Sequence, residues 1–371
     1  MIDAERSETW RSRLLAVLVG AALLTAVAVQ PSFAATPTSF YGVAPQETLT
    51  AGDYARMGQG KVGTLRIAIF WFEVDAYAPA GGYDFASTDT VVRNAALNGI
   101  NVLPTLYGTP AWVATGLNNR SCGSACAKFA PTTRAALAAW RDFVAATVGR
   151  YGTDGTFWSE NPGIPKRPIK DWSIWSEQNS RTFFAPKAKP ALYGKLLDTA
   201  ARAIKAQDSS AEVVLGGMAE LAGSRKATAA SDYLGQLYRV KGAKKDFDGV
   251  STHPYGARLK AVTEQVDLVT DEIKKAHDRK VDLWVTEVGA GSAKGGHPLN
   301  RGKKGQARLL TQVYKYFEKQ RRKLNVPAVI WYSWKDKTPS LCEWCATSGL
   351  FSADGAEKPA WRAFTKLTGG S

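Results

Sequence analysis

Histidine is scarce in this sequence: 371 residues contain only His253, His277 and His297. Because catalytic zinc sites commonly draw two or three ligands from histidine, a multi-histidine metal centre is not expected. His277 lies in a basic stretch and is interpreted as a surface residue. The chain also lacks GxSxG and HExxH sequences, which argues against a serine-hydrolase elbow and a zinc-protease helix. We therefore expect neither a metal nor an organic cofactor.

Cysteine is also rare, with four residues in two close pairs. Cys122 and Cys126 lie in CGSAC, and Cys342 and Cys345 lie in CEWC. An even number in an exported chain indicates disulfides, and we favour the two local pairs over the other connectivities. A four-cysteine zinc site is the alternative, although more than 200 residues separate the pairs.

Long apolar runs are absent except for one, residues 14–29, whose 16 residues fall short of the ~20 that span a bilayer. Arg11 and Arg13 precede this run, and small residues precede a possible cut after Ala34. This arrangement is typical of a signal peptide over residues 1–34, with a secreted, extracellular domain over 35–371. An uncleaved N-terminal anchor is the alternative. After cleavage we expect no stable membrane insertion.

Acidic residues are outnumbered, 33 against 48 Lys and Arg, which gives a net charge of +15. Residues 1–34 are neutral overall, so the remainder carries all of this charge. Such a surface attracts polyanions, which for an exported protein would be acidic polysaccharides, wall polymers or anionic surfaces. No nucleic-acid-reading motif is present, so nucleic acid is not an expected partner. A basic surface that serves only solubility is the other interpretation.

Short β-rich runs alternate with amphipathic stretches after residue 35, which predicts an α/β fold, a (β/α)8 TIM barrel in a single domain. Many of the runs are continuously apolar, as parallel strands covered by helices require. A doubly wound open sheet is the alternative, but no GxGxxG follows the first strand. The expected strands are 40–43, 62–71, 100–107, 169–175, 212–218, 247–253, 281–287 and 328–334, and the clearest helices are 132–151, 190–207, 262–275, 304–323 and 359–367. A long insertion, 108–131, directly follows the third strand and is expected to wall the active-site face.

Two expected strands, the fourth and the seventh, lead into a glutamate: Glu177 closely follows 169–175, and Glu287 ends 281–287. Strands four and seven face each other across an eight-stranded barrel, so these carboxyls should meet at its C-terminal mouth. Cleavage of a glycosidic bond needs two carboxyl groups, one to protonate the leaving oxygen and one to attack or to activate water. The Trp-rich stretch before Glu177 would favour its protonated form.

These strand ends resemble those of clan A glycoside hydrolases, which are retaining (β/α)8 enzymes, and most closely family 39 (β-xylosidase type) and related secreted bacterial glycanases. WSIWSEQN at 172–179 is similar to the W-x-I-W-N-E-P-N pattern, and WVTEVG at 284–289 to the aliphatic-W-x-T-E-x-G pattern. The resemblance implies that Glu177 is the acid/base and Glu287 the nucleophile. It differs at Ser176, where the pattern has an asparagine that contacts the sugar 2-hydroxyl; serine has a shorter reach and no amide donors.

Further substrate-binding candidates follow by position. The resemblance implies that Tyr255, or His253, bonds the nucleophile or lines the sugar site. Arg66 lies in an apolar run and needs a carboxylate partner, either Glu287 or one at the foot of the barrel. Trp334 ends the eighth strand and would stack on the sugar, unless it is a core residue. Tyr107 and Trp112 follow strand three and complete the candidate set.

The predicted function is a secreted, monomeric glycoside hydrolase that cleaves β-glycosidic bonds in a poly- or oligosaccharide by double displacement with retention. An acidic β-glycan is one candidate substrate. One alternative is a catalytically degenerate barrel that binds cell-wall or exopolysaccharide glycan without hydrolysis, suggested by Ser176. The other is a surface protein that binds polyanions through its charge alone.

Overall fold

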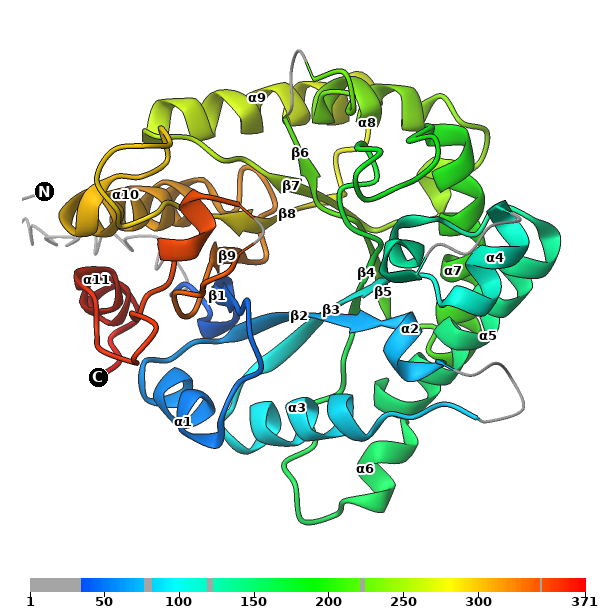
Figure 1. Cartoon of the computed structure of the whole chain (residues 1–371), viewed down its shortest axis with the longest axis horizontal. Helices are drawn as coiled ribbons and strands as arrows, with labels where there is room; N and C mark the ends of the chain where they lie inside the picture. Colours follow the sequence, from blue (N-terminus) through cyan, green and yellow to red (C-terminus); the bar gives the residue numbers. More distant parts are fainter. Residues whose placement is uncertain (1–34, 77–81, 119–122, 221–223, 341) are drawn as a thin grey trace, which may run out of the picture. The chain divides into compact units, whose positions relative to one another are not determined.

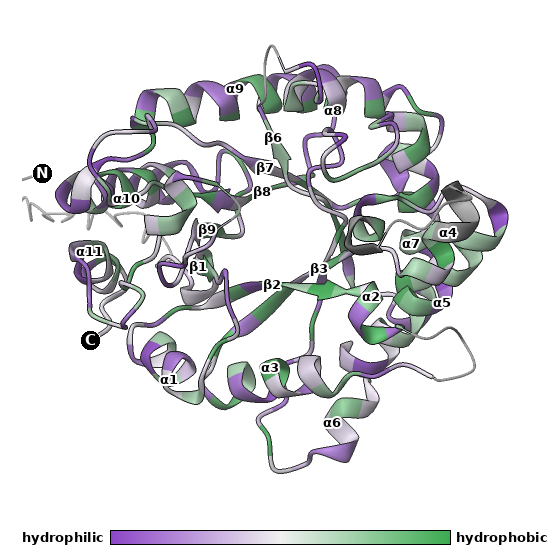
Figure 2. Cartoon of the chain, in the orientation of Figure 1, coloured by the Kyte–Doolittle hydropathy of each residue, from purple (hydrophilic) through white to green (hydrophobic). Residues whose placement is uncertain are grey.

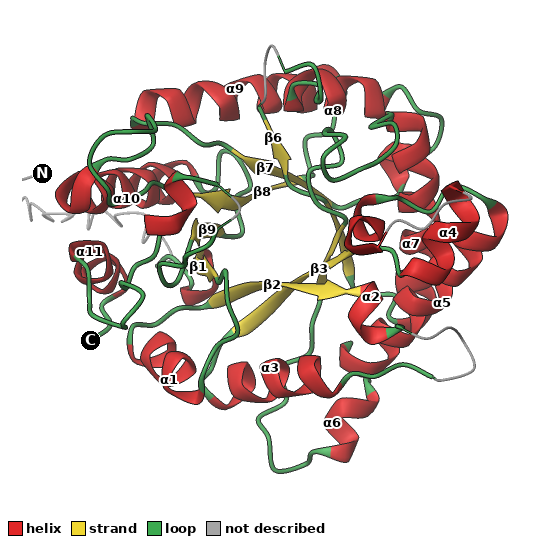
Figure 3. Cartoon of the chain, in the orientation of Figure 1, coloured by secondary structure: helices red, strands yellow, loops and turns green. Residues whose placement is uncertain are grey.

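The computed structural model describes residues 35–76, 82–118, 123–220, 224–340 and 342–371. Its parallel strands run β5-β4-β3-β2-β1-β9-β8-β7, and a β5–β7 pairing closes the ring. This closed eight-stranded arrangement confirms the predicted (β/α)8 TIM barrel (Figures 1 and 3). The strands are β1 Tyr41–Ala44, β2 Thr64–Phe70, β3 Asn101–Tyr107, β4 Asp171–Ile174, β5 Glu212–Leu215, β7 Gly249–His253, β8 Asp282–Val288 and β9 Val329–Tyr332, with a short β6, Met218–Ala219, extending the edge of β7.

Helices surround the strands, and the strongest sequence patterns give their positions well. The α7 helix coincides with the expected 190–207, and α5 begins two residues later than expected because Thr133 caps it by accepting the Ala136 N–H. The main helices are α1 Ala51–Gln59, α3 Ala86–Leu97, α4 Ala111–Asn118, α5 Arg134–Tyr151, α7 Pro190–Gln207, α8 Ala230–Tyr238, α9 Leu259–Lys275, α10 Gly302–Gln320 and α11 Pro359–Thr368, with shorter α2 Trp71–Val74 and α6 Thr156–Glu160.

The apolar interior has two layers, as in other barrels. A small cluster fills the barrel, and a larger one lies between the strands and the helices. Figure 2 shows the hydrophobic colour along the strands and mixed colours on helices such as α9, which turn one face outward. The inner cluster contains Ala44, Leu103, Val214, Trp284, Ala328 and Ile330.

The predicted signal peptide, 1–34, lies outside the described residues, so export and cleavage stay predictions. Within the described part of the chain, no helix combines the length and apolarity needed to cross a bilayer. The predicted Cys342–Cys345 disulfide is present. Cys122 lies outside the described residues, so the other predicted pair stays a prediction.

Candidate active site

Glu177 lies just beyond β4 in an unusual backbone conformation. Its φ is 43° and that of Trp175 is 69°, both in the left-handed region that non-glycine residues rarely adopt. Two backbone bonds hold this turn: Glu177 N–H donates to the Gly217 carbonyl at 2.8 Å, and Trp175 N–H to the Leu106 carbonyl at 2.9 Å. Strain of this kind concentrates at functional sites, where the surroundings fix it.

Two glycines at the end of β5 make room for this turn. A side-chain carbon on Gly216 would collide with the Trp175 backbone and the Gln178 amide. A side-chain carbon on Gly217 would overlap the His253 ring. The Gln178 amide in turn donates to the Gly216 carbonyl at 2.8 Å. The pair therefore lets Glu177 and His253 approach each other.

Glu287, in β8, is held by a cation and a phenol. Arg66 Nη1 lies 2.5 Å from its Oε1, and the Tyr255 hydroxyl donates to its Oε2 at 2.5 Å. Burial by itself would raise the pKa of Glu287, but the positive charges of His253 and Arg66 and these hydrogen bonds lower it below its usual value. The structure thus brings Arg66 to the active-site mouth rather than the foot of the barrel, and it keeps Glu287 ionised.

His253, at the end of β7, lies between the two glutamates. Its Nδ1 is 3.1 Å from Glu177 Oε1 and 3.6 Å from Glu287 Oε2, and its side chain is fully buried. One ligand atom from each of the three residues lies within 4.8 Å of the others. A cation could in principle bridge such a trio. However, Glu287 already accepts bonds on both oxygens and is neutralised by Arg66, so the trio is better suited to moving a proton.

Aromatic rings line the side of the mouth formed by β2 and β3. Tyr107 contacts Trp175 edge-on at 4.8 Å and Phe70 at 6.1 Å, and Phe70 contacts Phe72 at 5.0 Å. Burial and the negative charge of Glu177 raise the pKa of Tyr107, which stays a neutral phenol beside that carboxyl. Phe70 and Phe72 were missed from the sequence, although alternation along β2 from Arg66 to Phe70 could have indicated Phe70.

Two other predicted residues lie differently. Trp112 is partly buried, donates its indole N–H to the Asp75 carbonyl at 3.0 Å and packs edge-on against Trp71. Trp112 therefore holds the segment after β2 in place and supports the site indirectly. Ser176 is partly exposed and directly precedes Glu177 in the chain.

The expectation that Trp334 stacks on a sugar is wrong for this structure. Its side chain is 0% exposed, packs against Phe351 and Trp361, and donates its indole N–H to Asp53 at 2.9 Å. The strand ends at Tyr332, so the inward alternation that runs through Ile330 does not continue to position 334.

Tyr332 occupies the place expected for Trp334. Its ring packs against the inner cluster and, edge-on at 6.1 Å, against Trp344. Burial raises its pKa, and the negative charge of Glu287 raises it further, so the phenol lies near that carboxylate. Counting inward positions back from the strand end could have identified it.

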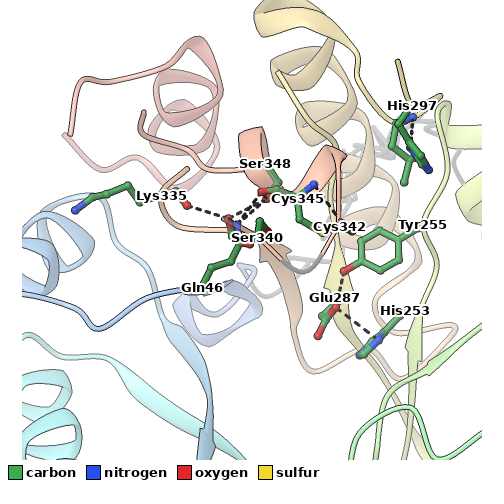
Figure 4. The surroundings of a disulfide bond; sticks show 12 residues. Gln46, His253, Tyr255, Glu287, His297, Lys335, Ser340, Cys342, Cys345 and Ser348 are labelled. Carbon is green, nitrogen blue, oxygen red and sulfur yellow. Dashed lines mark hydrogen bonds and ion pairs between the residues drawn. A yellow bond between two sulfur atoms is a disulfide. The ribbon is translucent and has the colours of Figure 1, made fainter. Parts of the chain in front are cut away.

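The loop after β9 supports the nucleophile side of the site (Figure 4). Trp344, between the disulfide cysteines, contacts the Tyr255 ring at 4.8 Å. Gln46, after β1, donates to the Cys345 carbonyl at 2.8 Å and to Ser333 Oγ at 2.7 Å. Figure 4 shows the Tyr255 hydroxyl pointing at Glu287, with His253 on the other side of the carboxylate.

No protein-family model and no curated protein sequence matches the chain. Among solved structures, it is similar to a family 39 glycoside hydrolase from Bacteroides cellulosilyticus, with a TM-score of 0.64 and 17% identity over 90% of this chain and 64% of that one. It is also similar to a family 39 β-xylosidase from Caulobacter crescentus, with a TM-score of 0.63 and 22% identity over 91% and 72%. It is also similar to a glucosidase from Croceicoccus marinus, with a TM-score of 0.63 and 16% identity over 89% of this chain and 67% of that one. The chain thus spans less than two thirds of the Bacteroides protein. The expected resemblance to clan A and family 39 is confirmed at the level of the fold.

Proposed function

We propose that this chain is a secreted glycoside hydrolase that cleaves β-glycosidic bonds with retention of configuration. The observation that carries the proposal is the approach of Glu177 and Glu287 within 4.8 Å at the mouth of the barrel. Carboxyl groups about 5–5.5 Å apart are typical of retaining enzymes, whereas inverting enzymes need roughly 6.5–9.5 Å to admit a water. The names of the similar structures, β-xylosidase and glucosidase among them, support the class of reaction.

Glu287 is the nucleophile in this mechanism. Its lowered pKa keeps it ionised, and Arg66 and Tyr255 orient one oxygen each. Attack on the anomeric carbon forms a glycosyl ester and neutralises the carboxylate. The Tyr255 hydroxyl, whose pKa is raised by burial and by the charge of Glu287, remains a hydrogen-bond donor throughout.

Glu177 is the general acid and then the general base. It protonates the departing oxygen while Glu287 attacks, and afterwards takes a proton from the water that hydrolyses the ester. Once Glu177 has given its proton to the leaving oxygen, it is ionised and can act as the base of the second step. His253 Nδ1 lies 3.1 Å from Glu177 Oε1 and holds this carboxyl in place for both steps.

The test is hydrolysis of an aryl β-glycoside panel, with product configuration followed by NMR. Retention with first-formed β product is expected, and Glu287→Ala should lower kcat/KM by roughly 10⁴-fold or more. Azide should restore turnover of that variant by replacing the missing nucleophile. Glu264→Ala, at an exposed position of α9, is the matched control. Wild-type rates in Glu287→Ala, or an inverted first product, would reject the mechanism.

A glycan-binding protein without hydrolytic activity is the second candidate, because Ser176 stands where the resembling enzymes have asparagine. Its hydroxyl reaches less far toward a 2-hydroxyl, and hydrogen bonds there contribute to the transition state. Glycan binding with no turnover of any glycoside in the panel, and turnover gained by Ser176→Asn, would favour this candidate.

A further inference from the structure

Six cations gather on loops at one side of the mouth, around the strand end that carries Glu177. The loops are 123–133 after β3, 178–189 after β4 and 224–229 after β6, and they contain no Asp or Glu. We call this set the basic rim: Lys128, Arg181, Lys187, Lys189, Arg225 and Lys226. In Figure 1 these loops gather between α4 and α8 at the edge of the barrel.

Backbone bonds join the three loops into one surface. Arg181 N–H donates to the Lys226 carbonyl at 2.8 Å, and Ala185 N–H to the Lys128 carbonyl at 2.8 Å. The Asn179 side chain adds bonds to the carbonyls of Ala219 and Thr228. The backbone positions that carry these cations are therefore fixed relative to one another.

The rim charges are not neutralised nearby. Five of the six residues are exposed, and Lys128 is partly exposed beside the Phe129 ring. Among the described residues, none of the six forms an ion pair with a carboxylate. The nearest acid along these loops, Glu220, instead accepts the Ser231 N–H at the start of α8.

The neighbouring loops after β1 and β2 carry acidic residues. The segments 45–50 and 71–76 hold Glu47, Glu73 and Asp75 and no Lys or Arg. The loops after β3, β4 and β6 are therefore basic where the loops after β1 and β2 are acidic. Clefts lined by one sign of charge concentrate ligands of the other sign.

We propose that the basic rim binds negatively charged groups on the leaving-group side of the substrate, which is an acidic glycan. This inference rests on the proposed function, in which Glu177 protonates the leaving oxygen. Arg181 follows Glu177 by four residues, and the Ser180 N–H donates to the Glu177 carbonyl at 2.8 Å. Sugar units beyond that oxygen therefore extend toward the rim.

The test compares β-1,4-glucan oligosaccharides with carboxymethylated and sulfated oligosaccharides of equal length. The rim variant is Lys189→Gln, Arg225→Gln and Lys226→Gln, whose side chains are exposed and do not form the bonds that join the loops. The control removes the same charge from the outer surface of α10 through Lys304→Gln, Arg308→Gln and Lys315→Gln. Binding by calorimetry and kcat/KM are both measured, with melting curves to verify folding.

The rim variant should lower the kcat/KM ratio of charged to neutral oligosaccharide by about tenfold and weaken binding similarly, because charges at a binding edge control encounter and its salt dependence. The α10 variant should not change this ratio. An equal effect of both variants, or no preference of the wild type for charged over neutral oligosaccharide, would overturn the inference. Rim-dependent binding without hydrolysis of any substrate would support the rim and reject the proposed catalysis.

Discussion

Arg66 Nη1 lies 2.5 Å from Glu287 Oε1, and the guanidinium is nearly buried, with 9% of its side chain exposed. A cation at this distance, shielded from water, acts together with His253 to hold the nucleophile in its ionised form. The pairing joins β2 to β8 at the active-site mouth, so the chemistry of Glu287 depends on a residue 221 positions away in the chain.

Arg66→Met should therefore shift the acidic limb of the kcat/KM profile to higher pH by about one unit or more, because loss of the positive charge raises the pKa of Glu287. The profile is measured with an aryl β-glycoside. Arg66→Lys keeps the charge and should retain most of the wild-type limb. An unchanged limb in Arg66→Met would contradict this role.

Tyr332 and Trp334 give opposite predictions. Tyr332→Ala should lower kcat/KM by about tenfold or more, because its half-buried ring borders the nucleophile. Trp334→Phe should lower the free energy of unfolding by about 1–3 kcal/mol, since it loses packing and the bond to Asp53, while kcat/KM stays within about twofold. Both variants are measured by urea denaturation and by steady-state kinetics. A large loss of kcat/KM in Trp334→Phe but not in Tyr332→Ala would show that Trp334, and not Tyr332, contacts the substrate.

Three carboxylates at the foot of the barrel should make stability fall with rising pH. Asp171, Glu212 and Asp282 line a cavity of about 190 Å³. Burial, and then the negative charge of Glu212, raise the pKa of Asp171 to about 7 and that of Asp282 to about 6. The folded chain keeps these protons where the unfolded chain, with pKa near 4, has lost them. The free energy of unfolding therefore decreases between about pH 4 and pH 7.

Asp171→Asn with Asp282→Asn should flatten this decrease, as followed by melting temperature at pH 4.5, 6 and 8. Asp154→Asn, at a position with 96% of its side chain exposed, is the control. A slope in the double variant as steep as in the wild type would show that other groups cause it.

Removal of the Cys342–Cys345 disulfide should affect substrate binding as well as stability. A ring this short contributes about 2 kcal/mol by loop entropy. The loop also holds Trp344 against Tyr255, which donates to Glu287, so Cys342→Ser with Cys345→Ser should raise KM several-fold. Wild-type protein treated with a reductant provides the comparison. An unaltered KM in both the double variant and the reduced wild type would show that this loop does not affect substrate binding.

The strands and the two glutamates were predictable because parallel strands read as apolar runs and a barrel gathers their C-terminal ends. Glu177 and Glu287 each follow such a run, and the structure brings them together. Helices α1, α3 and α8 were not identified, since they have only 9, 12 and 9 residues. Propensity and periodicity carry little signal over helices this short.

Side-chain direction beyond a strand end was not predictable. Trp334 and Tyr332 are two residues apart, and their roles are exchanged because the regular alternation stops at Tyr332. The left-handed turn at Trp175 and Glu177 is set by contacts with Leu106 and Gly217, which come from other strands. Such positions depend on tertiary contacts that one segment of sequence does not contain.

The glycine pair at 216–217 sets a limit on how this barrel can be altered. The carbon atoms that a larger residue would add there coincide with the space taken by the His253 ring and the Gln178 amide. Efforts to change substrate preference should therefore leave this strand end untouched and work on the outer loops, where substitutions do not compress the proton-transfer centre.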